Sequence, residues 1–398
     1  MDRRYGVRYL IAPGGERLPL LVHTTTELPC QLALRWLVQD RRGRVAAATL
    51  ADDQRAVGSV YGWAEHALPM SLDAFLLAGH TLDAPQIAGL AKYVKTGGSL
   101  VLAGSIGTNA GSLAPLAFNQ RWHKIRLFLR WAAERSAGSG AQQPKQQQAI
   151  TAACERIDRL FGQHQVGTSV NQSLRLVSPV AWTQIQQIVA LERADVWPDP
   201  SVRVRNQAMV YLAMNTGMRI GELLKLTLGQ LPRGQERHVV VKRRPDDALD
   251  PRREEPQVKT NERELPVPNF LARMLATYAT QYRPRSRSPY VFLAQGDRPL
   301  TSRQARRIPE RISQISGLHV TWHVFRHTFC DTVYHVLADR PNGIDILQEL
   351  AGWASPLSAT PYVRHARQQH ANAFLASYQE GLFPPPGTAT VASASAPE

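Results

Sequence analysis

The sequence predicts a mainly α-helical protein that carries one small antiparallel β-sheet in its second half. Apolar residues recur at helical spacing along most of the 398 residues, whereas short β-like runs occur only between residues 238 and 267. With 43% apolar residues, a chain of this length can form two or three domains, each with its own core. We therefore expect a helical N-terminal domain followed by an α+β domain.

Shifts in composition place the domain boundaries. The polar run Ser136–Gln148 (SAGSGAQQPKQQQ) is typical of a linker, and the residues after Phe383 contain almost no large apolar side chain. The glycine-rich stretch Gly97–Gly111 receives no assignment. The predicted parts are an N-terminal extension (1–20), a helical domain (21–140), a linker (141–177), an α+β domain (178–382) and a disordered tail (383–398).

The charge of the chain indicates a polyanionic partner. The 47 Lys and Arg residues exceed the 32 Asp and Glu residues, which gives a net charge of +15. Nucleic acid is the commonest partner of so basic a protein, although a generally basic surface is an alternative explanation. Arginine dominates the basic residues, and its planar group favours bidentate contacts with phosphate.

Cysteine usage and hydropathy indicate a cytoplasmic protein. Cys30, Cys154 and Cys330 are widely spaced and form no metal-binding pattern, so we expect free thiols in a reducing compartment. The first fifteen residues contain charges and a Pro-Gly-Gly break where a signal peptide would need an apolar run. No apolar run is long enough to span a membrane.

Three helices are predicted in the first third of the chain, over Leu28–Val38, Thr49–Leu68 and Asn119–Arg135. The third has an apolar stripe that includes Trp122, which we assign to core packing rather than to base stacking. Basic residues surround this stripe and are candidates to lie along DNA phosphates. They are Arg121, Lys124, Arg126 and Arg130.

In the second half, Ser178 is predicted to cap a helix that has Pro179 at its first position. A further helix is expected over Val202–Met214. The charged, proline-containing stretch Lys242–Glu255 is predicted to be a loop rather than core. Three β-like runs are expected here, over 238–242, 257–260 and 263–267, and the pattern returns to helices after residue 299.

The motif TGMRIGELLKL places Arg219 near the first turn of a helix, after Thr216 and Gly217 end the preceding one. Leucines of the motif can anchor this helix in the core, so that the guanidinium could bind two oxygens of one phosphate. Glu222, three residues on, lies on the same face and could orient Arg219. Taken alone, the motif also fits an ordinary surface Arg–Glu pair.

The motif HVFRHTF places His323 and Arg326 one helical turn apart, so both can reach one site. Such a pair offers a hydrogen-bond donor or proton carrier beside a cation, although a structural histidine is the commoner case. Downstream, Trp353 follows the helix-ending Gly352, and Tyr362 follows nine residues later. By itself, this tyrosine would be interpreted as an aromatic anchor.

The stretch KTNERELPVP predicts a β-hairpin in which the run 257–260 pairs with 263–267 around the turn Asn261–Glu262. Lys259 would project near the tip of this arm as a mobile proton donor. The alternative is an exposed lysine on a polar hairpin.

In their order and spacing, these motifs resemble the tyrosine recombinase (phage integrase) family. The resemblance covers roughly Ser178–Tyr378 and rests on TGMRIGELLKL, KTNERELPVP, HVFRHTF and the Gly-Trp pair with its downstream tyrosine. The N-terminal third is loosely similar to the family's helical core-binding domain. The resemblance therefore implies a DNA core-binding domain over residues 21–140 and a catalytic domain over residues 178–382.

The family implies a site-specific recombinase or integrase that cuts and rejoins DNA through a 3′-phosphotyrosine at Tyr362. Arg219 and Arg326 would neutralise the phosphate, and His323 would donate a hydrogen bond or assist removal of the tyrosine proton. Lys259 would protonate the leaving 5′-oxygen. Trp353 stands where a histidine is commoner, and would brace the phosphate through its N–H or by packing.

The resemblance also implies the partners. Double-stranded DNA would be bound by a homotetramer on two sites, with no metal, cofactor or ATP in the reaction. The amphipathic segment Asn372–Leu382 would pack onto a neighbouring subunit or onto its own domain. A type IB topoisomerase and a catalytically inactive DNA-binding accessory protein are the alternatives.

Pro361 immediately before the tyrosine is less usual in the family. A proline restricts the residue before it, so Thr360 is expected outside a helix. Tyr362 would then begin a short helix on a stiffened loop.

Overall fold

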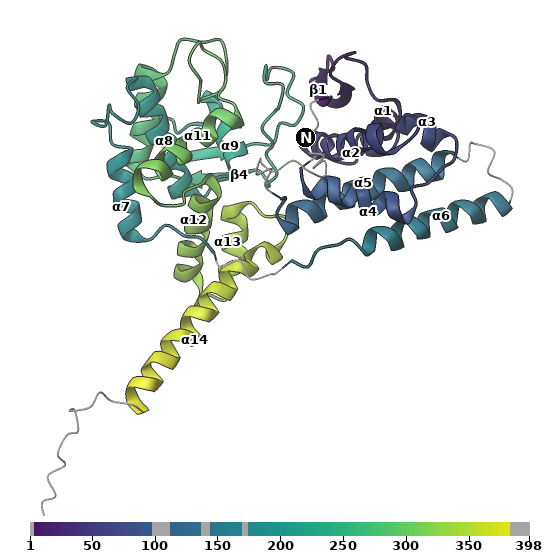
Figure 1. The fold of residues 1–398 in the computed structure, drawn as a ribbon. Coiled ribbons are helices and arrows are strands. Elements are labelled where there is room, and N and C mark those ends of the chain that lie inside the picture. Colours follow the sequence, from purple (N-terminus) through teal and green to yellow (C-terminus); the bar gives the residue numbers. More distant parts are fainter. Residues whose placement is uncertain (1–3, 98–111, 137–143, 169–173, 383–398) are drawn as a thin grey trace, which may run out of the picture. The chain divides into compact units, whose positions relative to one another are not determined.

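The computed structural model describes residues 4–97, 112–136, 144–168 and 174–382, drawn as ribbon in Figure 1. These residues divide into two compact units. Unit 1 comprises Met1–Asn171 together with Asp246–Glu255, and unit 2 comprises Gln172–Pro245 together with Pro256–Glu398. The predicted tail 383–398 and most of the stretch 97–111 lie outside the described residues.

Unit 1 is a helical body with a β-hairpin at its start. Its largest buried side chains are aromatic, and Trp122 stacks on Phe161 with 4.0 Å between ring centroids, which confirms its assignment to the core. The elements of unit 1 are β1 (Tyr5–Ile11), β2 (Arg17–His23), α1 (Gln31–Trp36), the π-helix η1 (Leu37–Arg41), α2 (Ala47–Ala67), α3 (Leu72–Leu77), α4 (Ala84–Lys95), α5 (Pro115–Ser136) and α6 (Pro144–Gly162).

The hairpin β1–β2 corrects two sequence predictions. Residues 1–20 are not a mere extension, and the described part of the chain contains a second antiparallel sheet. Gly15, at φ 89°, supplies the turn, and Leu21 and Val22 of β2 are buried. Each strand is only seven residues long and gains its stability by packing on α2, which local periodicity does not reveal. The predicted class, mainly α with a small antiparallel sheet, is confirmed, and this hairpin adds a second sheet to it.

Helix α6 lies within the stretch 141–177 that was predicted to be a linker, so that prediction is wrong for residues 144–162. The N-terminal half of α6 is polar, and its apolar face is confined to the last two turns. Ile157, Leu160 and Phe161 are buried against the rest of unit 1. The helix is therefore part of the core of this unit.

The segment Asp246–Glu255, predicted to be a loop outside any core, packs into unit 1 around Arg17. The Arg17 guanidinium donates to the backbone carbonyls of Gly15, Asp247, Asp250 and Arg252. It also lies 3.4 Å from a carboxylate oxygen of Glu255, and both side chains are 1% exposed. A buried charge needs such partners, and all of them except the Gly15 carbonyl come from a segment more than 200 residues away.

Unit 2 is mainly helical and holds one two-stranded sheet. In that sheet Val239 faces Leu265, and both are buried. The elements are α7 (Pro179–Ile188), α8 (Pro200–Thr216), α9 (Ile220–Lys225), η2 (Leu228–Gln230), β3 (His238–Val241), β4 (Arg263–Pro266), α10 (Asn269–Thr277), η3 (Tyr278–Tyr282), α11 (Ser302–Ser316), α12 (Trp322–Leu337), α13 (Gly343–Ala351), η4 (Pro356–Ala359) and α14 (Thr360–Leu382).

Local signals account for several helix ends in unit 2. The Ser178 hydroxyl accepts a hydrogen bond from the Ala181 backbone N–H, which confirms the predicted cap of α7. Asp199 caps α8 in the same way, and Gly217 ends α8 in the left-handed conformation at φ 61°. A glycine is favoured there because other residues meet a steric penalty at positive φ.

The predicted hairpin of 257–260 with 263–267 is wrong, because β4 pairs with β3 and residues 257–260 form no strand. The hydrogen bonds of this stretch go elsewhere. The Thr260 hydroxyl donates to the Glu222 carboxylate, and the Asn261 N–H donates to the Gly352 carbonyl. The approach to β4 is thus a loop bound to α9 and α13.

Helix α14 leaves the body of unit 2 after its first two turns (Figure 1). Ala366 is its last buried side chain among those the structure describes, and residues 367–379 are all exposed. The three cysteines are buried free thiols, as expected. None of the described helices combines the length and apolar content needed to cross a membrane.

Candidate active site

The candidate site is built where four helices of unit 2, α9, α12, α13 and α14, approach one another. Arg219 precedes α9 directly, and the buried Leu223 and Leu224 anchor this helix in the core as predicted. Two residues earlier, the Gly217 backbone lies against the ring of Phe329 on α12. A Cβ added there would come within 2.3 Å of the ring. This close approach connects the base of Arg219 to α12.

The Arg219 guanidinium is half-buried, and its Nη1 atom is buried without a hydrogen-bond partner among the described residues. Desolvation, followed by the nearby Arg326 cation, lowers the pKa of Arg219 to about 10. A buried donor without a partner destabilises the fold, because burial removes its hydrogen bond to water and no protein group replaces that bond. An anion placed at this group would relieve both the missing hydrogen bond and the repulsion.

Glu222 does not bind the Arg219 side chain, which corrects the predicted pairing. Its carboxylate accepts the Arg219 backbone N–H at 2.6 Å, and so fixes the main chain rather than the guanidinium. The ion-pair partner of Glu222 is Arg263 on β4, at 2.9 Å and 3.1 Å from its two oxygens. Hydrogen bonds from Arg263 hold the pKa of Glu222 below its usual value despite burial that acts to raise it.

Arg326 is held by the ends of two other helices. One guanidinium nitrogen donates to the Gly217 carbonyl at 2.7 Å, and another donates to the Ala351 carbonyl at 2.8 Å. The side chain is 3% exposed, and its cation lies 5.7 Å from the centroid of the Trp353 ring. Arg326 is therefore a fixed charge at the junction of α8, α12 and α13.

Tyr362 lies in the first turn of α14, on the Trp353 ring that the Arg326 cation also approaches. Its ring stacks on Trp353 with centroids 5.7 Å apart and planes 15° apart, and its side chain is 3% exposed. Desolvation, followed by the Cys330 thiol, raises the pKa of the phenol above its usual value, while Arg326 and Arg219 act in the opposite direction. The phenol is thus neutral at pH 7 in this conformation.

The backbone before Tyr362 differs from the prediction. Thr360 is helical, at φ −48° and ψ −41°, and α14 is 23 residues long rather than short. Pro361 is tolerated because a proline in the first turn of a helix interrupts no intrahelical hydrogen bond. The 3₁₀ turn η4 leads directly into α14, so the restriction on Thr360 is overridden.

His327 is a site residue that the sequence interpretation missed. Its Nδ1 lies 2.9 Å from the Tyr362 hydroxyl, and its ring meets that of His323 edge to face at 4.5 Å. Desolvation, followed by His323 and Arg326, lowers the pKa of His327 to about 4, so the imidazole is neutral at pH 7. The available signal was spacing: His327 lies four residues after His323, on the same helical face.

Lys259 is exposed, and its backbone lies beside the site. Its two successors, Thr260 and Asn261, are bound to Glu222 and to the Gly352 carbonyl. Gly221 permits this close approach, since a Cβ there would lie 2.2 Å from the Gln257 carbonyl oxygen. The backbone at Lys259 is therefore anchored, and the Lys259 side chain is open to solvent.

The four basic residues of α5 belong to unit 1, and three of them have acidic partners there. Lys124 lies 3.7 Å from Asp53, and Asp158 accepts from Arg130 at 2.6 Å and lies 3.8 Å from Arg126. These ion pairs connect α5 to α2 and α6. Arg121 is half-buried and has no ion pair among the described residues. DNA binding by this face stays a prediction.

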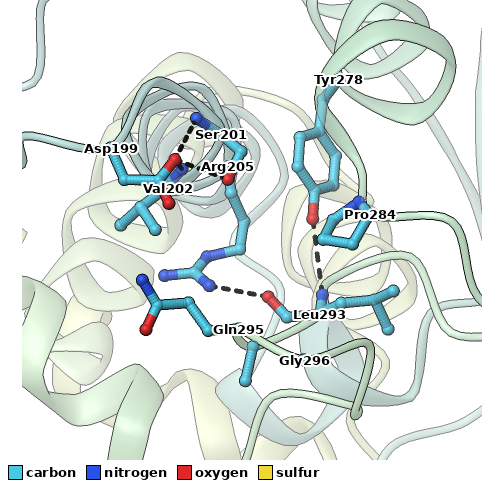
Figure 2. Close-up of a pocket in the computed structure, with 10 residues that line it drawn as sticks. Asp199, Ser201, Val202, Arg205, Tyr278, Pro284, Leu293, Gln295 and Gly296 are labelled. Carbon is cyan, nitrogen blue, oxygen red and sulfur yellow. Dashed lines mark hydrogen bonds between the residues drawn. The ribbon is translucent and has the colours of Figure 1, made fainter.

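A separate pocket of about 210 Å³ in unit 2 contains none of the predicted site residues (Figure 2). Figure 2 shows Arg205 at its centre, donating at 2.6 Å to the Leu293 carbonyl, and Tyr278, whose hydroxyl accepts the Leu293 N–H. The Asn206 amide oxygen accepts hydrogen bonds from Nε and Nη2 of Arg205. These satisfied groups indicate that the pocket stabilises the turn at Leu293 rather than forming the site.

Comparison with known proteins agrees with this geometry. Residues 182–369 match the model of the phage integrase family. The chain is 30% identical over 170 residues to the tyrosine recombinase XerC of Bacillus pumilus, which covers 40% of this chain and 49% of that relative. It is 27% identical over 168 residues to the tyrosine recombinase XerA of Pyrococcus furiosus. The chain thus spans about half the length of the curated relatives that it matches.

The fold is similar to that of solved recombinases. A structure of the Tn1549 transposon integrase with circular intermediate DNA has a TM-score of 0.55 and 16% identity, covering 86% of this chain and 98% of that one. The XerH site-specific recombinase, bound to its difH substrate, has a TM-score of 0.51 and 16% identity, with 88% and 86% covered. The matched residues contain Arg219, Lys259, His323, Arg326, Trp353 and Tyr362. Residues 182–369 of this chain are therefore similar to the phage integrase family, and the relatives that it matches are tyrosine recombinases.

Proposed function

We propose that this protein is a site-specific DNA recombinase that cuts and rejoins strands through a phosphotyrosine formed at Tyr362. The observation that carries the proposal is the placement of Tyr362, whose hydroxyl lies 2.9 Å from a neutral histidine and whose phenol responds to the charges of Arg326 and Arg219. A nucleophile, a proton acceptor and two cations together are what transfer of a phosphodiester requires. The matches to tyrosine recombinases support the same conclusion.

In the first step the Tyr362 oxygen attacks the scissile phosphorus and forms a phosphotyrosine. The phenolic proton must leave, and His327 is the group placed to accept it at Nδ1 when its own proton is on Nε2. Because burial keeps the pKa of His327 at about 4, the imidazole is ready to accept at neutral pH. This assigns to His327 the proton transfer for which His323 was the sequence candidate.

Arg219 and Arg326 stabilise the negative charge that grows on the phosphorane. The Arg219 Nη1 atom, buried without a partner in the described chain, is available for a phosphate oxygen. Arg326 is held by two backbone carbonyls and supplies a charge that needs no reorganisation. His323 donates a hydrogen bond to the phosphorane, and Trp353 packs beside the phosphorane.

The bond between phosphorus and the 5′-oxygen then breaks, and that oxygen takes a proton from Lys259. The exposed ammonium sits on an anchored loop, which lets it reach a leaving group on bound DNA. The phosphotyrosine replaces one ester by another, so a 5′-hydroxyl of a partner strand can reverse the reaction without ATP. No metal takes part, because the cations of the site carry the charge.

The partner is double-stranded DNA, as the net charge of +15 supports. Recombination of two sites calls for a homotetramer. The apolar side chains Phe374, Leu375 and Tyr378, 71%, 51% and 54% exposed on α14, support packing of this helix on another subunit. Strand exchange between two duplexes, rather than relaxation of one, separates this function from a topoisomerase.

The proposal predicts a covalent protein–DNA adduct that forms in EDTA. A duplex carrying the target site, nicked so that the 5′-hydroxyl fragment diffuses away, should trap the adduct, visible on a denaturing gel. Mapping of the labelled peptide should place the link at Tyr362. If adduct formation required added Mg²⁺, the metal-free chemistry would be wrong.

His327→Gln should slow adduct formation about 10²-fold, because glutamine keeps a hydrogen bond but carries no proton. DNA affinity should stay unchanged. His370→Gln on the exposed part of α14 is the control, and it should react at the wild-type rate. Equal rates for His327→Gln and wild type would remove His327 from the reaction.

The same variant tests the low pKa of His327 through folding stability. The folded pKa of about 4 lies below the ordinary value near 6.5, so the fold favours the neutral imidazole. The stabilising effect is complete above pH 6.5 and is lost as the pH falls toward 4, because the unfolded chain binds the proton first. Urea unfolding from pH 7.5 to 4.5 should show a smaller loss of stability in the variant than in the wild type.

A further inference from the structure

One turn beyond Tyr362, three side chains from α12 and α14 converge on one point. One carboxylate oxygen of Asp331 lies 2.8 Å from Nδ1 of His365, and the other lies 3.6 Å from Nε2 of His335. One ligand atom from each residue lies within 4.8 Å of the other two. The imidazole rings are 6.2 Å apart and inclined by 74°, so they present their nitrogens from different directions.

We propose that Asp331, His335 and His365 form a binding site for a divalent transition-metal ion of the zinc class, which joins α12 to α14. The donor set consists of two imidazole nitrogens and one carboxylate oxygen. Such a set suits zinc, which binds three protein ligands and leaves one position for water. Magnesium prefers oxygen ligands and is disfavoured here.

The charge of Asp331 supports a cation at this point. Its side chain is 9% exposed, and in the described part of the chain no lysine or arginine pairs with it. A buried carboxylate needs a counter-charge, and an ion held between the two rings would supply it. A metal ion would be bound by the carboxylate oxygen and by a nitrogen of each imidazole at once.

The helical positions favour a built site. Asp331 and His335 are four residues apart, so they lie on one face of α12 and keep their spacing whatever α14 does. His335 and His365 are 33% and 25% exposed, which leaves the point open to an ion from solvent. Only His365 comes from the second helix, so binding of the ion connects the two.

The location gives the ion a mechanical role. Of the described residues in α14, Ala366 is the last that is buried, and His365 is the last whose side chain bonds to α12. An ion at His365 would therefore fasten the first turns of α14, which carry Tyr362. This consequence rests on the proposed function, whereas the metal site itself does not.

Calorimetric titration of the full chain with zinc, after EDTA treatment and dialysis, tests the site. We expect one tight equivalent of zinc and no heat from Mg²⁺. His335→Gln and His365→Gln should each weaken zinc binding by more than about 10-fold, while His370→Gln, on the exposed part of α14, should bind as the wild type does. Zinc should also slow hydrogen exchange of the amides of Thr360 and of residues 362–366 in the wild type and in His370→Gln, but not in His335→Gln.

The proposal is overturned if zinc does not bind, or if both cluster variants bind it as tightly as the wild type. The three residues would then be a hydrogen-bonded group with a shared proton. Adduct formation by the same preparations is measured separately in EDTA, so a failure of zinc binding leaves the recombinase function standing. Conversely, zinc bound by a protein that forms no adduct would retain the metal site and reject the function.

Discussion

Tyr362→Phe is expected to abolish the covalent DNA adduct while DNA binding and folding persist. The substitution removes the oxygen that we propose as the nucleophile, and no other described phenol lies in this cluster of Arg326, His327 and Trp353. The phenyl ring keeps its stacking on Trp353. The fold loses the hydrogen bond to His327, which contributes about 1 kcal/mol, and the weaker hydrogen bond with the Cys330 thiol.

The measurement uses the nicked duplex on a denaturing gel, with DNA affinity from a mobility shift and the melting temperature as controls. Tyr378→Phe is the matched variant, because it removes a hydroxyl from the same helix at an exposed position. It should form adduct at the wild-type rate. Any adduct that persists in Tyr362→Phe would assign the nucleophile to another residue.

Arg219→Ala is expected to slow adduct formation about 10³-fold, because it removes a charged donor from the phosphorane. The stability of the fold should not decrease. The Nη1 atom, which has no hydrogen-bond partner in the described part of the chain, and the pKa lowered to about 10 both indicate that burying this cation costs stability in the free protein. The melting temperature of Arg219→Ala should therefore equal or exceed that of the wild type, as is common where function and stability oppose each other.

Arg193→Ala serves as the control for Arg219. Arg193 lies in the same unit and pairs with Asp195 at the surface, so it should change neither rate nor stability. A fall in melting temperature that parallels the fall in rate would show that Arg219 acts through the fold instead. Arg219→Lys should recover only part of the rate, because an ammonium cannot make the bidentate contact.

The elements that local patterns specify were predicted well. Ser178 as the cap of α7, Gly217 at the end of α8 and the burial of Leu223 beside Arg219 follow from caps, positive φ and helical spacing. These signals lie within a few residues of each other, so the sequence carries them without reference to the rest of the fold. The hairpin β1–β2 and helix α6 were missed, because these elements are stabilised by packing on parts of unit 1 that local sequence patterns do not reveal.

The sequence by itself determined the resemblance to the phage integrase family and the candidate site residues that this resemblance implies. It did so because their order and spacing along the chain are specific even though each motif alone is weak. Only the tertiary structure decided which side chains meet. It paired Glu222 with Arg263, directed residues 260 and 261 to α9 and α13, and brought His327 to the Tyr362 hydroxyl. A buried charge or hydroxyl takes whichever partner the fold brings within reach, and that partner can be 35 or more residues away in the chain.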